Sequence, residues 1–355
     1  MVYNFNAGPS TLPQTVLEEA SKAIINFNNS GLSILEIGHR TPLFESVMEE
    51  ARSLVRELMN LDDDHEVLYL HGGATVQFMQ VPMNLLDENE TVAIAETDVW
   101  GTKAIKEARL FGKVDVVCSS KESNFNYIRK DFTVPDDAKY FHITSNNTIY
   151  GTQWQKIPEV KVPLVADMSS DILSRKLDFN SFDLIYAGAQ KNMGAAGTNL
   201  VVVNKNILGK IKRPIPAIMD YRNHINAKSM LNTPPVFAIY VSMLTLRWLK
   251  ENGGVEAIEK RNNEKAALLY NAIDNSSIFF PTVVKKEDRS KMNVCFVMKD
   301  KEMEKGFLEF SQKNNIYGIK GHRTVGGFRA SLYNALPLSS VEYLVGKMAE
   351  FEKGI

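Results

Sequence analysis

The chain has 355 residues, of which 44% are hydrophobic and 23% are charged, and its formal net charge is −1. This length suggests two domains, and this composition is typical of a globular protein without disordered regions. The near-neutral charge argues against nucleic acid or a membrane surface as the main partner. The N-terminus lacks the features of a signal peptide and no stretch approaches the roughly 20 apolar residues of a membrane span, so we expect a cytoplasmic protein.

Helical and extended patterns alternate along most of the chain. Residues 43–61 follow Thr41 and Pro42 and place apolar side chains on one helical face. These side chains are Phe44, Val47, Met48, Ala51, Leu54, Val55 and Leu58. Seven short apolar runs follow, at residues 66–70, 91–95, 114–118, 139–143, 163–167, 183–187 and 200–203. This alternation predicts an α/β fold with a mostly parallel central sheet covered by helices.

The pattern changes near the C-terminus. Gly253 and Gly254 interrupt the helical pattern before a long amphipathic helix. The remainder predicts a strand, a helix, two strands and a helix, and Ser339 with Glu342 predicts a capping box at the start of the last helix. We therefore predict an N-terminal segment 1–15, a large domain 16–261 and a smaller C-terminal α+β domain 262–355.

Ligands of open α/β sheets bind beyond the carboxyl ends of the strands, so the residues that follow the predicted strands are informative. After strand 66–70, Gly72 and Gly73 precede a helical pattern that begins at Ala74 and Thr75. Glycines before a helix N-terminus form a cradle of backbone N–H groups that suits a phosphate. Taken alone, a pair of glycines is also an ordinary connection between elements.

Four other side chains draw attention near strand ends. Trp100 comes after residues 91–95 and is placed at the end of that predicted strand, where core packing is its commoner role, and Thr148 follows another strand in an ordinary loop. Asp167 ends an apolar run, where a carboxylate is costly unless it is paired or hydrogen-bonded. Lys191 stands among small residues in AGAQKNMGAAG, between two apolar runs. A solvated lysine needs no such setting.

A lysine, an aspartate, an aromatic plate and a glycine-led helix N-terminus are the groups that hold pyridoxal phosphate. Lys191 would form the Schiff base with the cofactor aldehyde. Asp167 would keep the pyridine nitrogen protonated, and the helix N-terminus would take the phosphate. The combination predicts a pyridoxal-phosphate enzyme in which Lys191 and Asp167 are the catalytic residues.

Longer motifs extend from one end of the chain to the other. They are NFNAGPSTLP at 4–13, GHRTP at 38–42, ADMSSDILSR at 166–175, IYAGAQKNMG at 185–194, LNTPPVFAIY at 231–240 and GHRTVGGFRASLYNALP at 321–337. In these motifs the sequence resembles the phosphoserine aminotransferases, a family of class V aminotransferases among the fold-type I pyridoxal-phosphate enzymes. The resemblance implies amino transfer from glutamate to 3-phosphohydroxypyruvate, giving phosphoserine and 2-oxoglutarate in serine biosynthesis. It also implies a candidate second reaction, the phosphohydroxythreonine step of pyridoxine biosynthesis.

The resemblance also implies how the cofactor is held. Trp100 is expected to stack on its ring and Thr148 to bond its phenolic oxygen. Its phosphate is expected to contact the backbone of Ala74 and Thr75 and the side chain of Gln190. Some family members carry arginine at the position of Thr75, so only backbone contacts are expected there. Two further residues are expected to reach the phosphate in the neighbouring subunit of a homodimer with shared active sites, namely Asn232 and Thr233.

The tetrapeptide Gly-His-Arg-Thr occurs twice, at 38–41 and 321–324, and Arg329 follows the second copy. Arginine offers forked donors to carboxylate and phosphate, so this pattern suits a substrate with several negative charges. By resemblance, Arg329 binds the α-carboxylate. The two His-Arg pairs bind the phosphate or the side-chain carboxylate: His322 and Arg323, with His39 and Arg40 from the partner subunit.

Three other functions can be weighed against this one. Another class V aminotransferase acting on an unphosphorylated substrate would not need two His-Arg pairs. A cysteine desulfurase needs a reactive cysteine, whereas Cys118 and Cys295 lie in apolar runs typical of buried strands. A nucleotide-binding dehydrogenase could use the two glycines, but no G-x-G-x-x-G follows the first strand. The histidines lack metal-ligand spacing, so no metal site is predicted.

Overall fold

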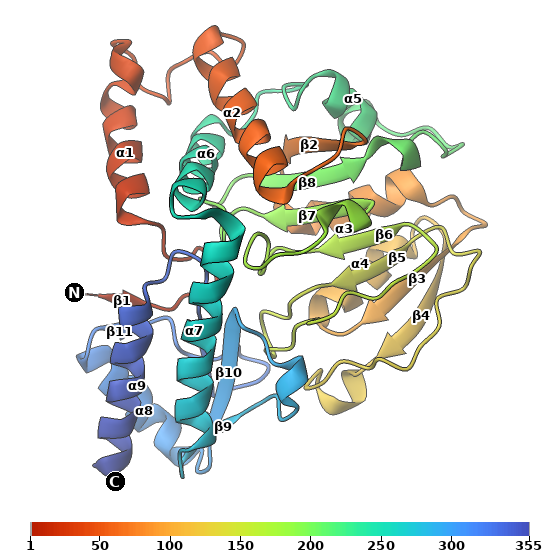
Figure 1. The fold of residues 1–355 in the computed structure, drawn as a ribbon. Helices are drawn as coiled ribbons and strands as arrows, with labels where there is room; N and C mark the ends of the chain where they lie inside the picture. The colour runs from red at the N-terminus through yellow and green to blue at the C-terminus, as the bar shows by residue number, and fades with distance from the viewer. Residues whose placement is uncertain (1, 355) are drawn as a thin grey trace.

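Seven strands form the central sheet, in the order β2-β8-β7-β6-β5-β3-β4 (Figure 1). The computed structural model describes residues 2–354. The strands are β2 (His65–Leu70), β3 (Thr91–Glu96), β4 (Lys113–Ser119), β5 (Phe141–Thr144), β6 (Leu164–Asp167), β7 (Leu184–Gly188) and β8 (Asn199–Asn204). Only β8 is reversed, because it pairs antiparallel with β2 and β7 while the other neighbours pair in parallel. The predicted mostly parallel sheet is confirmed, and the carboxyl ends of its other six strands share one edge.

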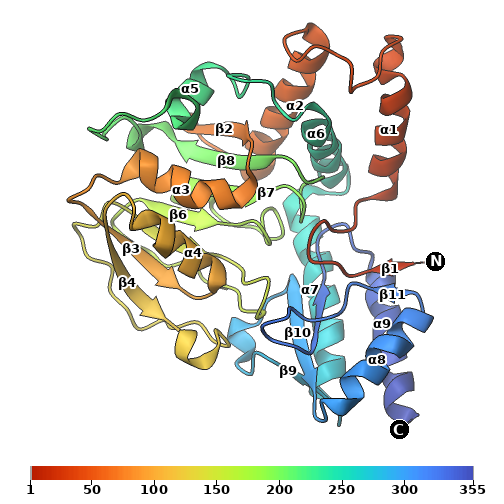
Figure 2. The ribbon, with the colours of Figure 1, turned by 180° about the vertical axis from the view of Figure 1, so that it is seen from behind.

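Both faces of this sheet are covered, which explains the nearly continuous apolar runs of its strands. In β2, Val67 and Tyr69 pack with α1 (Gln14–Ile25), α2 (Pro42–Met59) and α6 (Val236–Glu251). Leu68 and Leu70 point to the other face, where they pack with α3 (Gly73–Leu85), α4 (Val99–Ala108) and α5 (Tyr221–Asn226). Figure 2 shows α3 and α4 lying across that second face.

The helix predicted at residues 43–61 is α2. Pro42 occupies its first turn and Asn60 ends it in the left-handed conformation. Six of the seven side chains of the predicted face are buried, whereas Leu58 is only half-buried and Met59 is buried instead. The periodicity therefore located the helix and almost all of its buried face.

A second core lies in the C-terminal part of the chain. It begins on α7 (Gly254–Asp274), which starts where Gly253 has a φ of 93°. It also includes a three-stranded sheet of order β12-β10-β9 and two helices. These elements are β9 (Phe279–Pro281), β10 (Asn293–Met298), α8 (Glu302–Lys313), β12 (Phe328–Ser331) and α9 (Leu338–Lys353). The proposed boundary between residues 261 and 262 falls inside α7.

The N-terminus belongs to this second core as well. Strand β1 (Tyr3–Asn4) pairs in parallel with β11 (Ile316–Tyr317), and Phe5 is fully buried among the apolar side chains of the C-terminal part. Figure 1 shows the two strands beside each other, next to α9. The first and last parts of the chain therefore fold together.

Two details of the C-terminal prediction are wrong. Two strands, β9 and β10, precede α8, whereas the sequence predicted one; β9 is only three residues long and ends in Pro281, so it shows no alternation. Ser339 and Glu342 do not form a capping box, because α9 already begins at Leu338 after Pro337 and no side chain caps it. In residues 2–354, none of the helices combines the length and the apolar character needed to cross a membrane.

Candidate active site

A cavity of about 460 Å³ opens at the carboxyl ends of β2, β3, β5, β6 and β7. The segments that follow these strands supply most of its walls, and the two ends of the chain complete it. The lining residues are Ala7, Gly8, Gly72, Gly73, Ala74, Thr75, Phe78, Trp100, Thr144, Asn146, Thr148, Ile149, Asp167, Ser169, Ser170, Gln190, Lys191, His322 and Arg329. Nine of the predicted site residues are thus brought together: Ala74, Thr75, Trp100, Thr148, Asp167, Gln190, Lys191, His322 and Arg329.

Lys191 follows β7 and lies in the cavity wall. Its Nζ donates a hydrogen bond of 2.8 Å to Oγ1 of Thr148. Burial lowers the pKa of Lys191 to about 8, and the charge of Arg329 adds to this effect, while Asp167 and Asp98 oppose it. With this pKa, roughly a tenth of Lys191 is the neutral amine at pH 7, far more than for an ordinary lysine, and a neutral amine can attack an aldehyde.

Asp167 is the last residue of β6 and is only 5% exposed. Its Oδ1 accepts a hydrogen bond of 2.9 Å from the backbone N–H of Ser169. Burial raises the pKa of Asp167, while hydrogen bonds from Ser169 and the charge of Lys191 oppose that rise. A buried carboxylate in this position gains from a cationic partner, such as a protonated pyridine nitrogen.

The N-terminus of α3 faces the same cavity. Gly72 precedes it with a φ of 85°, and no side chain caps the first turn. A Cβ on Gly72 would lie 2.2 Å from Cγ2 of Val76, so only glycine fits this turn. The free N–H groups of the first turn and the helix dipole favour an anion there. Ala74 and Thr75 lie in this turn, as the sequence predicted.

Trp100 lies in the first turn of α4, and not at the end of a strand as predicted. Asp98 caps this helix, because its Oδ1 accepts a hydrogen bond of 2.6 Å from the N–H of Gly101. The indole packs against Phe78, with 6.4 Å between ring centroids, and Nζ of Lys191 lies 6.0 Å from the indole centroid. The ring thus offers a flat apolar surface close to the lysine.

An amine that can be neutral, a buried carboxylate, an aromatic plate and a glycine-led helix N-terminus surround one cavity. Pyridoxal phosphate needs these four groups, for its aldehyde, its ring nitrogen, its ring face and its phosphate. The residues present therefore fit this cofactor.

Arg329 and His322 form the side of the cavity contributed by the C-terminal part. Nη1 of Arg329 donates a hydrogen bond of 3.1 Å to the carbonyl oxygen of Thr148, and its buried Nε has no partner in residues 2–354. The backbone N–H of Thr324 lies 3.3 Å from Nδ1 of His322 and donates to it. This contact leaves Nε2 of the neutral imidazole as a donor. Arg323 is exposed beside His322 and does not line the cavity.

The remaining predicted site residues lie elsewhere in the single chain. His39 and Arg40 are in the turn before α2, and Asn232 and Thr233 are in the segment before α6. None of the four lines the cavity. The carbonyl oxygen of Thr233 accepts a hydrogen bond of 2.8 Å from Nε2 of His71. These residues were predicted to act in the active site of a partner subunit, and this remains a prediction.

Several cavity residues were not identified from the sequence. Ser169 and Ser170 directly follow Asp167, and Asn146 follows β5, so strand ends were again the available signal. Ala7 and Gly8 reach the cavity from the N-terminus, where the N–H of Ser10 donates to the carbonyl oxygen of Gln190 at 3.1 Å. Only the motif NFNAGPSTLP marked that segment.

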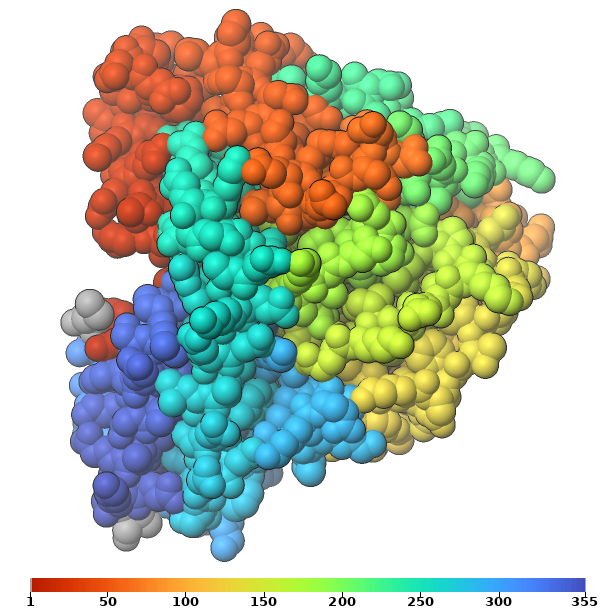
Figure 3. All heavy atoms as spheres, viewed as in Figure 1, coloured from red at the N-terminus to blue at the C-terminus, as the bar shows by residue number. Residues whose placement is uncertain are grey.

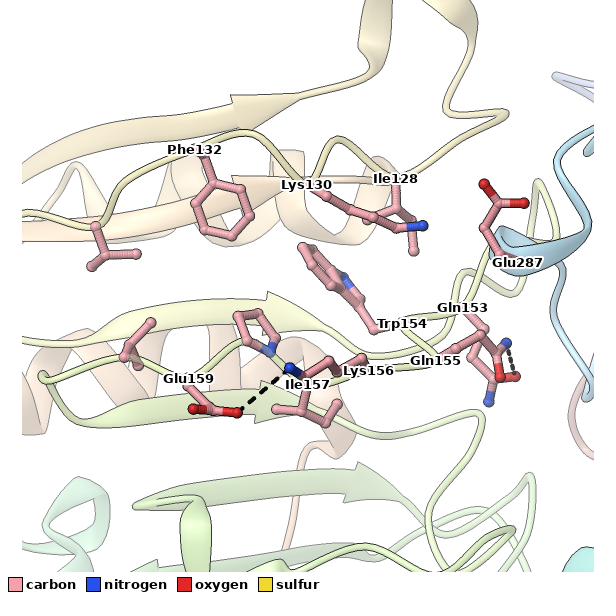
Figure 4. A pocket seen from close by; sticks show the side chains of 13 residues that line it. Ile128, Lys130, Phe132, Gln153, Trp154, Gln155, Lys156, Ile157, Glu159 and Glu287 are labelled. Atoms are coloured by element: carbon pink, nitrogen blue, oxygen red, sulfur yellow. Dashed lines mark hydrogen bonds and ion pairs between the residues drawn. The ribbon is translucent and has the colours of Figure 1, made fainter.

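A second cleft, of about 600 Å³, lies between residues 128–134 and 153–160 (Figure 4). Phe132, Trp154 and Ile157 give it a largely apolar lining, and it includes none of the predicted site residues. Its two lysines are paired, because Lys130 lies 2.7 Å from Asp288 and Lys156 lies 3.6 Å from Glu159. This cleft therefore lacks the free positive charge that an anionic substrate needs.

The geometry can also be compared with two other kinds of site, the reactive cysteine of a desulfurase and a metal site. Cys118 lies buried in β4 and Cys295 in β10, as predicted, and burial raises the pKa of both thiols to about 12. Neither is the reactive thiolate that a desulfurase requires. Within residues 2–354, no group of three or more His, Cys, Asp or Glu side chains could hold a metal ion.

Comparison with known proteins agrees with the cofactor that fits the cavity. The aminotransferase class-V family model matches residues 2–344. The phosphoserine aminotransferase of Flavobacterium psychrophilum is 55% identical over 354 residues, covering 99% of both chains. The solved phosphoserine aminotransferase of Bacillus circulans subsp. alkalophilus is 41% identical with a TM-score of 0.97, covering 100% of this chain and 99% of that one. The pyridoxal-phosphate-bound enzyme of Trichomonas vaginalis is 36% identical with a TM-score of 0.93, covering 98% and 100%.

The fold and the cavity thus define a pyridoxal-phosphate-dependent aminotransferase of fold type I. Within that class, the chain belongs to the phosphoserine aminotransferase branch of the class V aminotransferase family.

Proposed function

We propose that this protein transfers the amino group of glutamate to 3-phosphohydroxypyruvate and so produces phosphoserine and 2-oxoglutarate, in the direction of serine biosynthesis. One observation carries the choice of an anionic substrate. Arg323, Arg329 and Arg40 form no salt bridge within residues 2–354, whereas most arginines elsewhere, such as Arg289 with Asp274, are paired. Arg329 lines the cavity and Arg323 follows the cavity residue His322, so these two unpaired arginines suit a ligand with several negative charges.

Lys191, Asp167 and the N-terminus of α3 would hold the cofactor. Pyridoxal phosphate supplies an electrophilic aldehyde and a ring that delocalises the electron pair left when the substrate Cα–H bond breaks. Asp167 keeps the proton on the ring nitrogen. The backbone of Ala74 and Thr75, with the side chain of Gln190, binds the phosphate. Trp100 covers the ring and excludes water from one face.

Lys191 acts as the acid–base group. Its amine takes the proton from Cα of the amino acid and delivers it to the cofactor carbon C4′. The lowered pKa suits this task, because an ordinary lysine would be protonated almost completely at neutral pH. Thr148 holds the amine and would also bond the phenolic oxygen of the ring, so it keeps the two reacting groups aligned.

Arg329 would bind the α-carboxylate. Its Nε has no partner and its Nη1 contacts Thr148, so Nε and Nη2 can both donate to one carboxylate. His322 and Arg323 would bind the substrate phosphate together with His39 and Arg40 of a second copy of the chain. Glutamate uses the same cavity with a single side-chain carboxylate. One site then serves both half-reactions, and this predicts ping-pong kinetics.

An exposed apolar surface supports the homodimer. It lies on α1 and the segment that follows, and consists of Leu17, Ile24, Ile25, Leu32 and Leu35. Ile25 is 79% exposed and Leu35 is 61% exposed. In Figure 3, α1 forms a margin of the molecule, so this surface is open to a second copy. His39 and Arg40 come directly after this surface in the chain. Sedimentation of the holoenzyme at two concentrations tests the dimer.

The substrate proposal is tested by the absorbance change when one amino acid is added to the holoenzyme without a keto acid. Phosphoserine at low concentration should change the absorbance of the cofactor as it converts it to the amino form. Serine at the same concentration should leave the spectrum almost unchanged. Equal responses to both would favour a class V aminotransferase for an unphosphorylated substrate. The phosphohydroxythreonine of pyridoxine biosynthesis carries the same two anionic groups and can be tested in the same way.

A further inference from the structure

Lys103 lies on α4, almost one turn beyond Trp100, and its side chain is exposed. Its Nζ lies over the indole of Trp100, 4.3 Å from the ring centroid. Lys103 itself does not line the cavity, but Trp100 does, so the ammonium group of Lys103 lies against a side chain of the cavity wall. No established role of the site uses this lysine.

The charge of Lys103 acts on His322, one of the predicted phosphate-binding residues. Burial lowers the pKa of His322, and the positive charges of Arg329, Arg323 and Lys103 lower it further. Within residues 2–354, neither Lys103 nor these two arginines forms a salt bridge. Lys121, in contrast, follows the neighbouring strand β4 and is 3.4 Å from Glu96. Three positive side chains that are not neutralised by a salt bridge within the described residues thus act on the cavity residue His322.

A simpler role for Lys103 is to cover the indole with its aliphatic stem and its charge. At an exposed site, however, a cation–π contact is weaker than a charge-assisted hydrogen bond to a phosphate oxygen. An ammonium group held only by a ring face therefore gains when a phosphate arrives within reach. A phosphate dianion also attracts these positive side chains more strongly than the single carboxylate of glutamate does.

We propose that Lys103 is a specificity-determining residue that contacts the phosphate of the substrate, together with His322 and Arg323. The inference rests on the proposed function and deepens it, because it adds a further hydrogen-bond donor, from α4, to the two His-Arg pairs. Lys103 then contributes to the preference for phosphoserine over serine.

The test compares three variants of the holoenzyme. Lys103→Met keeps an apolar stem over Trp100 but removes the charge, and Lys103→Arg keeps the charge. Lys106→Met is the matched control, because Lys106 is an exposed lysine on the same helix and forms no salt bridge within residues 2–354. For each variant, kcat/KM is measured with phosphoserine and with glutamate, together with the inhibition constant of inorganic phosphate and the cofactor dissociation constant.

Lys103→Met should lower kcat/KM for phosphoserine about tenfold, as expected for the loss of one charge-assisted hydrogen bond. It should weaken phosphate inhibition similarly and leave the glutamate value within about twofold. Lys103→Arg should retain most of the phosphoserine value, and Lys106→Met should match the wild type. Raising the ionic strength should reduce the difference between wild type and Lys103→Met, because the interaction is partly exposed.

Two results would overturn the role of Lys103. Equal losses for both substrates, with weaker cofactor binding, would make Lys103 only a support for Trp100. Unchanged phosphoserine kinetics and phosphate inhibition in Lys103→Met would remove it from the subsite. Either result can occur while the wild-type enzyme still prefers phosphoserine to serine. A wild-type enzyme without that preference would instead contradict the proposed function itself.

Discussion

Thr148 contacts Lys191 through its hydroxyl, at 2.8 Å, while its own carbonyl oxygen accepts a hydrogen bond from Arg329 at 3.1 Å. Thr148, in the loop after β5, therefore fixes the position of the Lys191 amine with its side chain and the position of Arg329, the proposed carboxylate-binding arginine, with its backbone. This arrangement links the chemistry of the amine to the placement of the substrate.

The first prediction concerns Lys191. Lys191→Ala should leave a folded protein whose turnover is abolished, because the described residues that line the cavity include no other amine to carry the proton. Asp167→Asn should also fold but lose most of its activity, since a neutral amide cannot hold the proton on the ring nitrogen. Circular dichroism and steady-state assays check both variants. Substantial turnover by Lys191→Ala would remove the central role given to this lysine.

The second prediction concerns the protonation of Lys191 in the apoenzyme. Its neutral form increases as the pH rises through about 8, so labelling of Lys191 by an amine-directed reagent should have its midpoint there. Asp167→Asn should lower the midpoint, because the charge of Asp167 favours the ammonium form. Arg329→Ala should raise it, since the guanidinium favours the neutral amine. Peptide mass spectrometry measures the labelling, and a midpoint near 10.5 would contradict the effect of burial.

The third prediction separates the arginines. Arg40→Ala and Arg323→Ala should each reduce kcat/KM for phosphoserine far more than for glutamate, because each removes charge-assisted hydrogen bonds worth roughly 1.5–3 kcal/mol. Loss of two such bonds corresponds to about 10² to 10⁴ in specificity. Arg329→Ala should reduce kcat/KM for both substrates alike, since both carry an α-carboxylate. Similar losses for both substrates in all three variants would exclude a dedicated phosphate subsite.

Mixed dimers extend this test. If Arg40 acts in the partner's site, mixing Arg40→Ala with Lys191→Ala subunits creates one site in which both residues are intact. Activity should then reappear after the two inactive proteins are exchanged at low concentration. If the mixture stays inactive although subunits exchange, Arg40 does not act across the interface.

The fourth prediction concerns the turn before α3. Gly72→Ala should weaken cofactor binding at least tenfold, because both the backbone conformation and the contact with Val76 resist a side chain. Gly31→Ala is the matched control, since Gly31 has a φ of 80° and nothing lies within 4 Å of its Cβ position. Titration of each apoenzyme with the cofactor gives the dissociation constants. Equal values for the two variants would mean that the cradle does not depend on this turn.

The fifth prediction concerns a lysine outside the cavity. Lys265 on α7 is 1% exposed, and its Nζ donates to the carbonyl oxygens of Leu332, Tyr333 and Leu336 at 2.8, 2.7 and 3.1 Å. Lys265→Met should lower the free energy of unfolding by about 3 kcal/mol or more, because three buried carbonyl groups lose their donor. Lys260→Met, at an exposed position of the same helix, should have little effect. Denaturant titration compares the two, and equal midpoints would contradict the prediction.

The sequence predicted the sheet and α2 well because their apolar periodicity is strong and their side chains are buried on known faces. Trp100 was assigned to a strand end because the cap made by Asp98, which starts α4 before the tryptophan, was not recognised. The capping box at Ser339 failed because Pro337 already starts α9. Local patterns compete at such boundaries, and packing decides between them.

In the candidate site, too, sequence patterns located some residues and missed others. Thr148, Asp167 and Lys191 could be found because each lies at or beyond the carboxyl end of a strand that faces the cavity. Ala7 and Gly8 could not be assigned a place, since their position depends on contacts with residues far away in the sequence, such as the bond between Ser10 and Gln190. No periodicity or spacing reports contacts of that kind. The approach of Lys103 to Trp100 is likewise visible only in the folded chain.

The pairing of β1 with β11 determines when the protein can finish folding during synthesis. Residues 3–4 leave the ribosome first, but their partners at 316–317 are made more than 300 residues later. At ~5–20 residues per second, the first strand waits roughly 15–60 s for its partner. Ala7 and Gly8 come just after that strand, and Arg329 comes just after its partner, so the cavity cannot close before synthesis is nearly complete. A nascent chain stalled before residue 316 should therefore contain the central sheet but bind no cofactor tightly.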